Sequence, residues 1–293
     1  MGIVVEILNI IAPIFLCSGI GFLWAKLNFG YETSFITRLV ANIGFPCLIF
    51  SIISKNQTTE QIFREMSASA FISVLIFFIA GSIILKFLKL NQSTYLPSIA
   101  LANSGNMGLP LCLFAFGPIG LAYGFAYFWV QVILVFLLGN AIASKQFNFK
   151  AIFRVPIIWA VIIAFVFDHF DLSLPRGINN TIELLGGFSI PLCLITLGAS
   201  VANLKVNSLK RSIILSITRL AIGFVVGVFL SELLGFHGVA RGVLIIQCTM
   251  PSAVLNFLFA EIHQNQPQEI AGIVLISTLC SFATLPILLW FVM

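Results

Sequence analysis

The chain has 293 residues, of which 60% are hydrophobic and 9% are charged, and its formal net charge is +5. Because soluble domains carry about 25% charged residues, this composition excludes a soluble protein and indicates a single membrane domain that crosses a lipid bilayer several times. The positive charge is spread over short loops, so it is better explained by membrane topology than by binding to nucleic acid.

Ten apolar segments are long enough, at about 20 residues each, to cross a bilayer as helices. In chain order they are 3–24, 33–53, 67–88, 94–116, 121–143, 155–170, 180–201, 211–233, 237–260 and 269–292. The sixth segment is the shortest, because Asp168 and His169 interrupt it. The sequence therefore predicts an all-α polytopic membrane protein with ten transmembrane helices.

Basic residues are distributed unevenly between the alternating loops of this arrangement. One set of loops carries nine of them: Lys26, Lys86, Lys89, Lys145, Lys150, Arg154, Lys205, Lys210 and Arg211. The other set carries four: Lys55, Arg64, Arg176 and Arg241. Since an excess of Lys and Arg marks the cytoplasmic side, both termini are predicted to lie outside the cell (plasma or inner) membrane.

The prolines of the two halves of the chain recur at a nearly constant spacing. They form pairs that are 143, 145 and 141 residues apart: Pro13 with Pro156, Pro46 with Pro191, and Pro110 with Pro251. This spacing predicts two five-helix repeats, at 1–143 and 155–293, joined by a cytoplasmic connector at 144–154. Because five is an odd number, the second repeat must be inverted, which is an arrangement found in many secondary transporters.

Two of the predicted helices are interrupted at matching positions. The stretch LANSGNMGLP at 101–110 breaks the fourth segment, and QCTMPSAVLN at 247–256 breaks the ninth. Within a bilayer, non-helical backbone persists only where protein buries it or where it lines a wet cavity. A kinked core helix is the alternative for either segment, but the matching positions favour two broken helices that cross.

The breaks predict a site for an anion. Pro110 and Pro251 are each expected to begin the second half of a broken helix, because the missing N–H of proline costs nothing at that position. Unwound turns are then expected at 103–109 and 248–250. Two helix N-termini, each with about half a positive charge, would meet near the middle of the membrane and favour a carboxylate. The predicted substrate-binding residues are Asn103, Asn106, Met107, Gly108, Pro110, Gln247, Met250, Pro251, Ser252 and Asn256.

Two arginines lie inside apolar segments. Arg38 is close to the end of its segment, so its side chain is expected to extend to the membrane interface. Arg219 lies deeper and is costlier to bury, and a structural pairing with a carbonyl or carboxylate group is favoured for it. No nucleotide-binding, metalloprotease or serine-hydrolase motif occurs, and no cluster of metal-binding residues is visible. The sequence therefore predicts no enzyme, no cofactor and no metal.

Three stretches resemble the auxin efflux carrier family: NSGNMGLPL in the fourth segment, IPLCLITLGASV in the seventh and MPSAVLNFLFAE in the ninth. The connection between the fifth and sixth segments is short, which is similar to the mostly prokaryotic members. The resemblance implies that crossed helices four and nine belong to a transport domain, that the other helices form a scaffold, and that the protein is a homodimer. The prolines at the helix crossing of that family match Pro110 and Pro251 of this chain, and the family's polar contacts near them match Asn103, Asn106 and Asn256.

The predicted function is secondary transport of a small organic anion by alternating access, with the site at the crossing. The resemblance implies carboxylates such as malate or malonate, or auxin-like acids. The similar bile acid transporter fold uses an acidic residue for sodium at its crossing, and none is present here, so sodium coupling is in doubt. A potential-driven uniporter without a coupling ion and a membrane sensor that binds a ligand without moving it are the alternatives.

Overall fold

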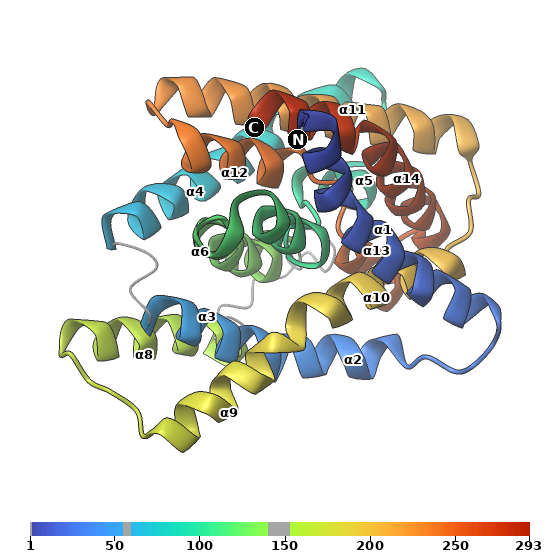
Figure 1. The fold of residues 1–293 in the computed structure, drawn as a ribbon. Helices are drawn as coiled ribbons and strands as arrows, with labels where there is room; N and C mark the ends of the chain where they lie inside the picture. The colour runs from blue at the N-terminus through green and yellow to red at the C-terminus, as the bar shows by residue number, and fades with distance from the viewer. Residues whose placement is uncertain (1, 55–59, 140–152) are drawn as a thin grey trace.

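The computed structural model describes residues 2–54, 60–139 and 153–293, which are predominantly helical (Figure 1). The first half contains α1 (Ile3–Lys26), α2 (Thr33–Leu39), η1 (Val40–Gly44), α3 (Phe45–Ser54), α4 (Glu60–Phe87), α5 (Gln92–Ala100), η2 (Ser104–Gly108), α6 (Leu109–Leu134) and η3 (Val135–Gly139). The second half contains α8 (Pro156–His169), α9 (Arg176–Gly187), α10 (Ser189–Asn203), α11 (Leu209–Leu233), α12 (Gly238–Thr249), α13 (Val254–Ile262) and α14 (Pro267–Val292). Most of the predicted connector, together with Lys55, Lys145 and Lys150, lies outside the described residues.

Seven helical stretches of the described residues are long and apolar enough to cross a bilayer. They are Ile3–Lys26, Thr33–Ser54, Gln61–Phe87, Ser104–Leu134, Arg176–Asn203, Leu209–Leu233 and Pro267–Val292. Two shorter apolar helices, α8 and α12, accompany them. Large apolar side chains on α1, such as Leu8 and Leu16, are exposed, as expected for a surface that contacts lipid. The protein is therefore an all-helical, multi-pass membrane protein.

The helix α6 is folded back on itself at Gly117. This residue has a φ of 65°, a left-handed conformation that glycine adopts without strain, and Pro118 follows it. A methyl group placed on Gly120 would lie 2.5 Å from the carbonyl oxygen of Cys112, and one placed on Gly124 would contact Leu109. Residues eight and fifteen positions apart are therefore in contact, which a straight helix does not allow. The chain thus reverses direction where the sequence predicts a loop between the fourth and fifth segments.

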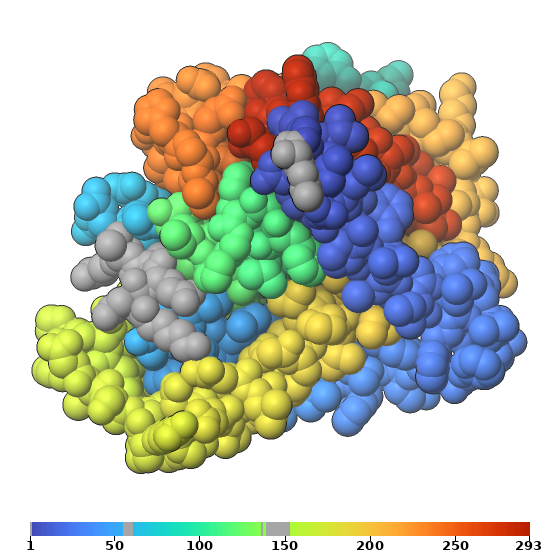
Figure 2. All heavy atoms as spheres, in the orientation of Figure 1, coloured from blue at the N-terminus to red at the C-terminus, as the bar shows by residue number. Residues whose placement is uncertain are grey.

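The helices pack in two bundles. The first, called here the crossing bundle, contains α4, α5, η2, α6 and α11 to α14. The second bundle contains α1, α2, η1, α3 and α8 to α10, and most of it lies below the crossing bundle in Figure 1. On the face seen in Figure 2, side chains of α6 (green) form the part of the crossing bundle that lies next to the second bundle.

Within the second bundle, α1 and α10 approach each other at two glycines. A methyl group on Gly198 would collide with the backbone of Ser18, and one on Gly21 would collide with the backbone of Ile195. Small residues of this kind let two helix backbones come together in a membrane, where packing replaces the hydrophobic effect. The close contact makes α1 and α10 one side of the second bundle.

The two helix breaks are present, but their bounds differ from the prediction. The non-helical residues are 101–103 and 250–253, rather than 103–109 and 248–250. Proline restricts the residue before it to an extended conformation, so Met250 has φ −58° and ψ 147° and α12 ends at Thr249. Pro251 therefore lies within the second break and does not begin α13, which starts at Val254.

The first break differs for another reason. Pro110 cannot donate a backbone hydrogen bond, and in a regular α-helix its ring would clash with the carbonyl group of Asn106. A wide π-helical turn, η2, precedes it, and the N–H of Gly108 donates to the carbonyl oxygen of Asn103 at 3.1 Å. The helix is therefore already wound from Ser104 onward, and Pro110 is not its first residue.

Candidate functional site

The two breaks contact each other directly. Ala102 and Ser252 form an isolated antiparallel β-bridge. The N–H of Asn103 donates to the carbonyl oxygen of Pro251 at 2.8 Å, and the N–H of Ala253 donates to that of Leu101 at 3.1 Å. Extended backbone at the depth of a membrane must find partners within the protein. Each break supplies them for the other, and residues 101–103 and 250–253 are called the crossing from here on.

Amide side chains complete the hydrogen bonds of the crossing. The Nδ2 of Asn256 donates to the carbonyl oxygen of Leu101 at 3.0 Å and to the Oγ of Ser252 at 3.0 Å. The Nε2 of Gln131 donates to the carbonyl oxygen of Ala102. An unsatisfied buried carbonyl costs about 1–3 kcal/mol, so these amides stabilise the extended conformation.

Arg219 joins the ends of the two helices that enter the crossing. Its side chain is fully buried and donates to the carbonyl oxygens of Ile99 at 3.0 Å, Cys248 at 2.8 Å and Met250 at 3.2 Å. The guanidinium group also lies 4.5 Å from the centre of the Phe77 ring. These carbonyls belong to the C-terminal ends of α5 and α12, where helices carry partial negative charge. The predicted structural pairing of Arg219 with a carbonyl or carboxylate group is confirmed, and its partners are backbone carbonyls.

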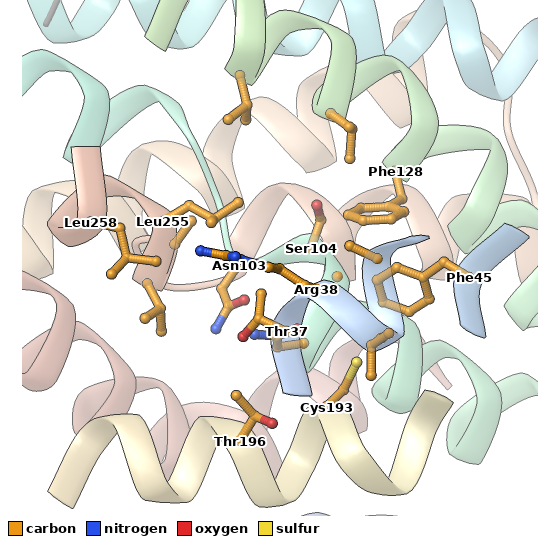
Figure 3. A pocket seen from close by; sticks show the side chains of 18 of the residues that line it. Thr37, Arg38, Phe45, Asn103, Ser104, Phe128, Cys193, Thr196, Leu255 and Leu258 are labelled. Atoms are coloured by element: carbon orange, nitrogen blue, oxygen red, sulfur yellow. The ribbon is translucent and has the colours of Figure 1, made fainter. Parts of the chain in front are cut away.

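A cavity of about 640 Å³ lies between the two bundles (Figure 3). The crossing bundle contributes the residues at which both broken helices resume, 102–106 and 253–255. The second bundle contributes side chains of α2, η1, α3, α8 and α10, among them Arg38, Phe45 and Thr196. The N-terminal ends of η2 and α13, which carry partial positive charge, therefore both reach the cavity.

Several buried polar atoms at the cavity have no hydrogen-bond partner within the described part of the chain. They are the Nδ2 of Asn103, the Oγ of Ser104, the Oε1 of Gln131 and the Oγ of Ser200. Asn103 is only 5% exposed, and its side chain lies in the pocket of Figure 3. A buried polar group without a partner is unusual and costly. These atoms are available to a ligand that carries hydrogen-bonding groups.

The ten predicted site residues all lie at or next to the crossing, but only Asn103 and Asn106 line the cavity. Met250, Pro251 and Ser252 belong to the second extended stretch, and Asn256 supports it. Met107, Gly108 and Pro110 are buried behind the cavity. A methyl group on Gly108 would collide with the side chain of Gln247, so Gln247 packs against the back of η2.

Other residues that line the cavity come from the second bundle and were not among the predicted site residues. Arg38, Phe45, Arg154 and Thr196 are the main examples. As a charged residue in an apolar segment, Arg38 could have been identified as a candidate site residue, but the sequence analysis expects its side chain to extend to the membrane interface. Arg154 belonged to the predicted connector. The pairing of helices that brings them to the crossing could not be read from the order of segments alone.

Thr196 is held in position by a neighbouring loop. Its Oγ1 lies 2.8 Å from the hydroxyl of Tyr31, which precedes α2. Burial raises the pKa of the Tyr31 phenol, although the hydrogen bond to Thr196 opposes this shift. The phenol is therefore protonated at neutral pH and can donate to Thr196, which fixes the wall of the cavity.

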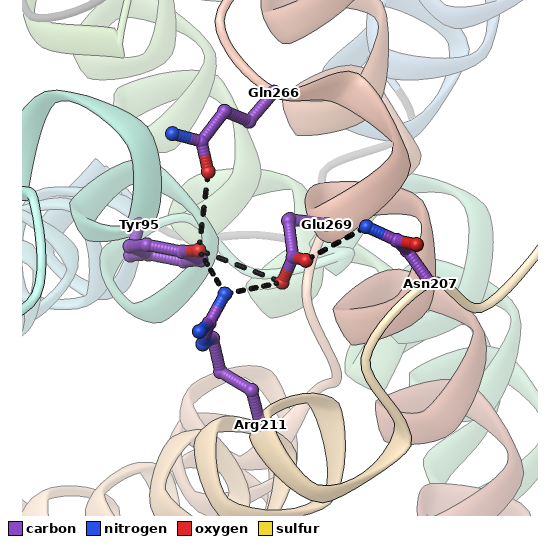
Figure 4. A network of polar contacts seen from close by, with 5 residues as sticks. All are labelled: Tyr95, Asn207, Arg211, Gln266 and Glu269. Carbon is purple, nitrogen blue, oxygen red and sulfur yellow. Dashed lines mark hydrogen bonds and ion pairs between the residues drawn. The ribbon is translucent and has the colours of Figure 1, made fainter.

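A second polar cluster lies away from the cavity (Figure 4). The carboxylate of Glu269 accepts hydrogen bonds from Arg211 at 3.0 Å and from Asn207 at 3.0 Å, and the Tyr95 hydroxyl accepts from Arg211 at 3.0 Å. These residues join the first turns of α5, α11 and α14. Since the charged groups are paired with each other, the cluster acts as a structural connection within the crossing bundle.

The family model and the relatives that match this chain agree on a family of membrane transporters. The family model described as membrane transport protein matches residues 6–152 and again residues 141–289. An uncharacterized transporter of Methanocaldococcus jannaschii is 28% identical over 274 residues, which cover 87% of each chain. An uncharacterized transporter of Methanothermobacter thermautotrophicus is 25% identical over 273 residues, covering 87% of this chain and 88% of that protein. Both names state transport and neither states a substrate.

Proposed function

Because the chain belongs to the membrane transport protein family, which is that of the auxin efflux carriers, we propose that it carries small organic anions across the cell membrane by alternating access. The protein is a membrane transporter and not an enzyme. The substrate class and the mechanism are the proposal, and malate- or malonate-like carboxylates are its first candidates.

The observation that carries the proposal is the chemistry of the cavity wall at the crossing. Two helix N-termini reach the cavity there, and the buried Nδ2 of Asn103 points to no partner among the described residues. None of the residues that line the cavity in the described part of the chain is acidic, and two of them are arginines. Donors, helix dipoles and net positive charge together favour a carboxylate over a cation.

The proposed architecture has ten spans in two inverted repeats, at 1–143 and 155–293, with both termini outside. The reciprocal hydrogen bonds of the two breaks support it, because an inverted pair of helices would meet in this antiparallel way. The reversal at Gly117 supports the separation of the fourth and fifth spans. The proposal also includes a homodimer, which rests only on the resemblance to the family.

The proposed movement is a displacement of the crossing bundle against the second bundle. The cavity lies between the bundles, so a substrate in it would contact Asn103 on one side and Thr196 on the other. The cavity lining extends to Thr33, Arg154 and Leu204, which lie at helix ends next to the predicted cytoplasmic loops. The structure would then correspond to an inward-facing state of the cycle.

Uptake by reconstituted protein tests the proposal. Proteoliposomes should accumulate labelled malonate or malate, with a KM that Asn103→Ala raises about tenfold, because one hydrogen bond to a charged group is lost. Thermal stability should be unchanged, since no group in the described chain depends on the Nδ2 of Asn103. Asn179→Ala, on α9 and outside the cavity lining, is the matched control. Saturable binding without flux would contradict transport and favour a sensor, and equal KM values for the wild type and Asn103→Ala would contradict the site.

A further inference from the structure

Two arginines of the second bundle line the cavity. Arg38 lies in the last turn of α2, and Arg154 lies two residues before the start of α8. In Figure 3 the side chain of Arg38 points into the pocket, towards Asn103 and Leu255. Arg38 is an exposed residue that lines this cavity. Both arginines belong to the second bundle, whereas Asn103 belongs to the crossing bundle.

Neither arginine has an anionic partner in the described chain. The ion pairs found there join Arg211 with Glu269 and Arg241 with Glu232. Residues 55–59 and 140–152, which the structure does not describe, contain lysines but no aspartate or glutamate in their sequence. Among the residues that the structure describes, the cavity lining thus carries two positive charges and no acidic side chain. An anion that enters the cavity gains from both charges without displacing a protein carboxylate.

The two walls can bind two different groups of one molecule. The crossing offers the amide of Asn103 and two helix N-termini, which suit one carboxylate. A guanidinium group presents a planar set of donors that matches a second carboxylate in a bidentate way. A cavity of about 640 Å³ has ample volume for a small dicarboxylate between these walls.

On the basis of the proposed function, we propose that Arg38 and Arg154 bind the second carboxylate of a dicarboxylate whose first carboxylate lies at the crossing. The arginines are then specificity-determining residues that select dianions over monoanions of the same size. They also give the substrate a contact on each bundle, so that a dianion is held by both bundles and a monoanion by the crossing bundle alone.

The test compares a dicarboxylate with its half-amide, which has nearly the same shape but one charge fewer. Uptake of labelled malonate and malonamate is measured in proteoliposomes of neutral phosphatidylcholine for the wild type, Arg38→Gln, Arg38→Lys and Arg154→Gln. The wild type should prefer malonate about tenfold in kcat/KM, as expected for one charge-assisted contact. Each glutamine variant should lose most of that preference by raising the KM for malonate, while malonamate uptake changes less than about twofold. Arg38→Lys should keep part of the preference, because it keeps the charge and loses the bidentate geometry.

The control is Arg176→Gln, which removes an exposed arginine at the start of α9, outside the cavity lining. It should leave the preference for malonate unchanged. Equal uptake of malonate and malonamate by the wild type, or an equal loss of both in Arg38→Gln, overturns the inference while transport of anions stands. Loss of the preference when phosphatidylglycerol is added also overturns it, because the arginines would then bind lipid headgroups. Absence of uptake for every anion contradicts the proposed function itself.

Discussion

At the scale of single residues, the crossing depends on one buried cation. Arg219 is 0% exposed and satisfies three carbonyl groups at the ends of α5 and α12. Four helix ends meet at the crossing, and their charges are separated in space. The two negative ends share the guanidinium group of Arg219, and the two positive ends reach the cavity. The arginine thus allows the N-terminal ends to remain available to a ligand.

We expect Arg219→Met to destabilise the protein strongly. The substitution keeps apolar contact with Phe77 but leaves three buried carbonyls without a donor, at about 1–3 kcal/mol each. The melting temperature in detergent should fall by about 10 °C, given about 2–4 °C per kcal/mol for a chain of this size. Arg241→Met, which removes an arginine whose ion-pair partner Glu232 is 68% exposed, is the control and should change the melting temperature by about 2 °C at most. A melting curve of Arg219→Met that coincides with the control would show that the carbonyls find other partners.

The sequence identified most of the residues of the crossing but not their separate roles. Asn103 and Asn256 were both predicted to bind substrate, and both are asparagines close to a helix break. In the structure Asn103 lines the cavity, while the Nδ2 of Asn256 is used by Leu101 and Ser252. Which way an amide points depends on the exact residue at which the helix unwinds. That residue is set by contacts between segments about 150 positions apart, which one sequence does not display.

At the scale of elements, proline positions explain why the breaks were found and why they were displaced. Pro251 acts on the residue before it, so the second break begins at Met250. Pro110 acts on the turn before it, which widens into η2 instead of unwinding. The sequence thus predicts that both helices are irregular. It does not distinguish a wide turn from an extended one, because proline can cause either, through its missing N–H group or through the clash of its ring with the residue before it.

We expect Pro110→Ala to impair transport without loss of stability. Alanine can donate to the carbonyl group of Asn106 and permits a regular α-helical turn, so η2 should tighten and Asn103 and Asn106 should rotate relative to the cavity. The KM for a carboxylate should rise about tenfold, because the loss of one hydrogen bond to a charged group weakens binding by about that factor. The free energy of unfolding should change by about 1 kcal/mol or less. Uptake assays and melting curves check the two expectations together. An unchanged KM would show that the wide turn does not orient the two asparagines.

At the scale of the whole molecule, the sequence predicts a helical membrane protein and the reversal between the fourth and fifth segments. Its ten segments correspond to seven helical stretches that meet the length and composition of a span, because the fourth and fifth segments share the stretch Ser104–Leu134, the sixth is the short helix α8, and the ninth is divided between α12 and α13. The helix α8, with 14 residues, is about 21 Å long, so it is shorter than a hydrocarbon core of about 30 Å. Apolar composition predicts where a segment can enter a bilayer, whereas helix breaks and packing between the bundles decide how the segment is built.

The last prediction concerns movement between the two bundles. In a variant without its six native cysteines, Thr196→Cys on α10 and Leu258→Cys on α13 would face one cavity from different bundles. A flexible cross-linker with two methanethiosulfonate ends, which forms a reducible disulfide with each cysteine and releases methanesulfinate, should abolish flux, because alternating access requires the bundles to separate or slide. Tyr31→Cys with Thr196→Cys is the matched control, since these two side chains are already in contact within the second bundle. Cross-linking the control pair should leave most of the flux intact, and reduction of the linker should restore flux in the first pair. Full transport by the cross-linked first pair would show that anions cross the membrane without relative movement of the bundles, as in a channel.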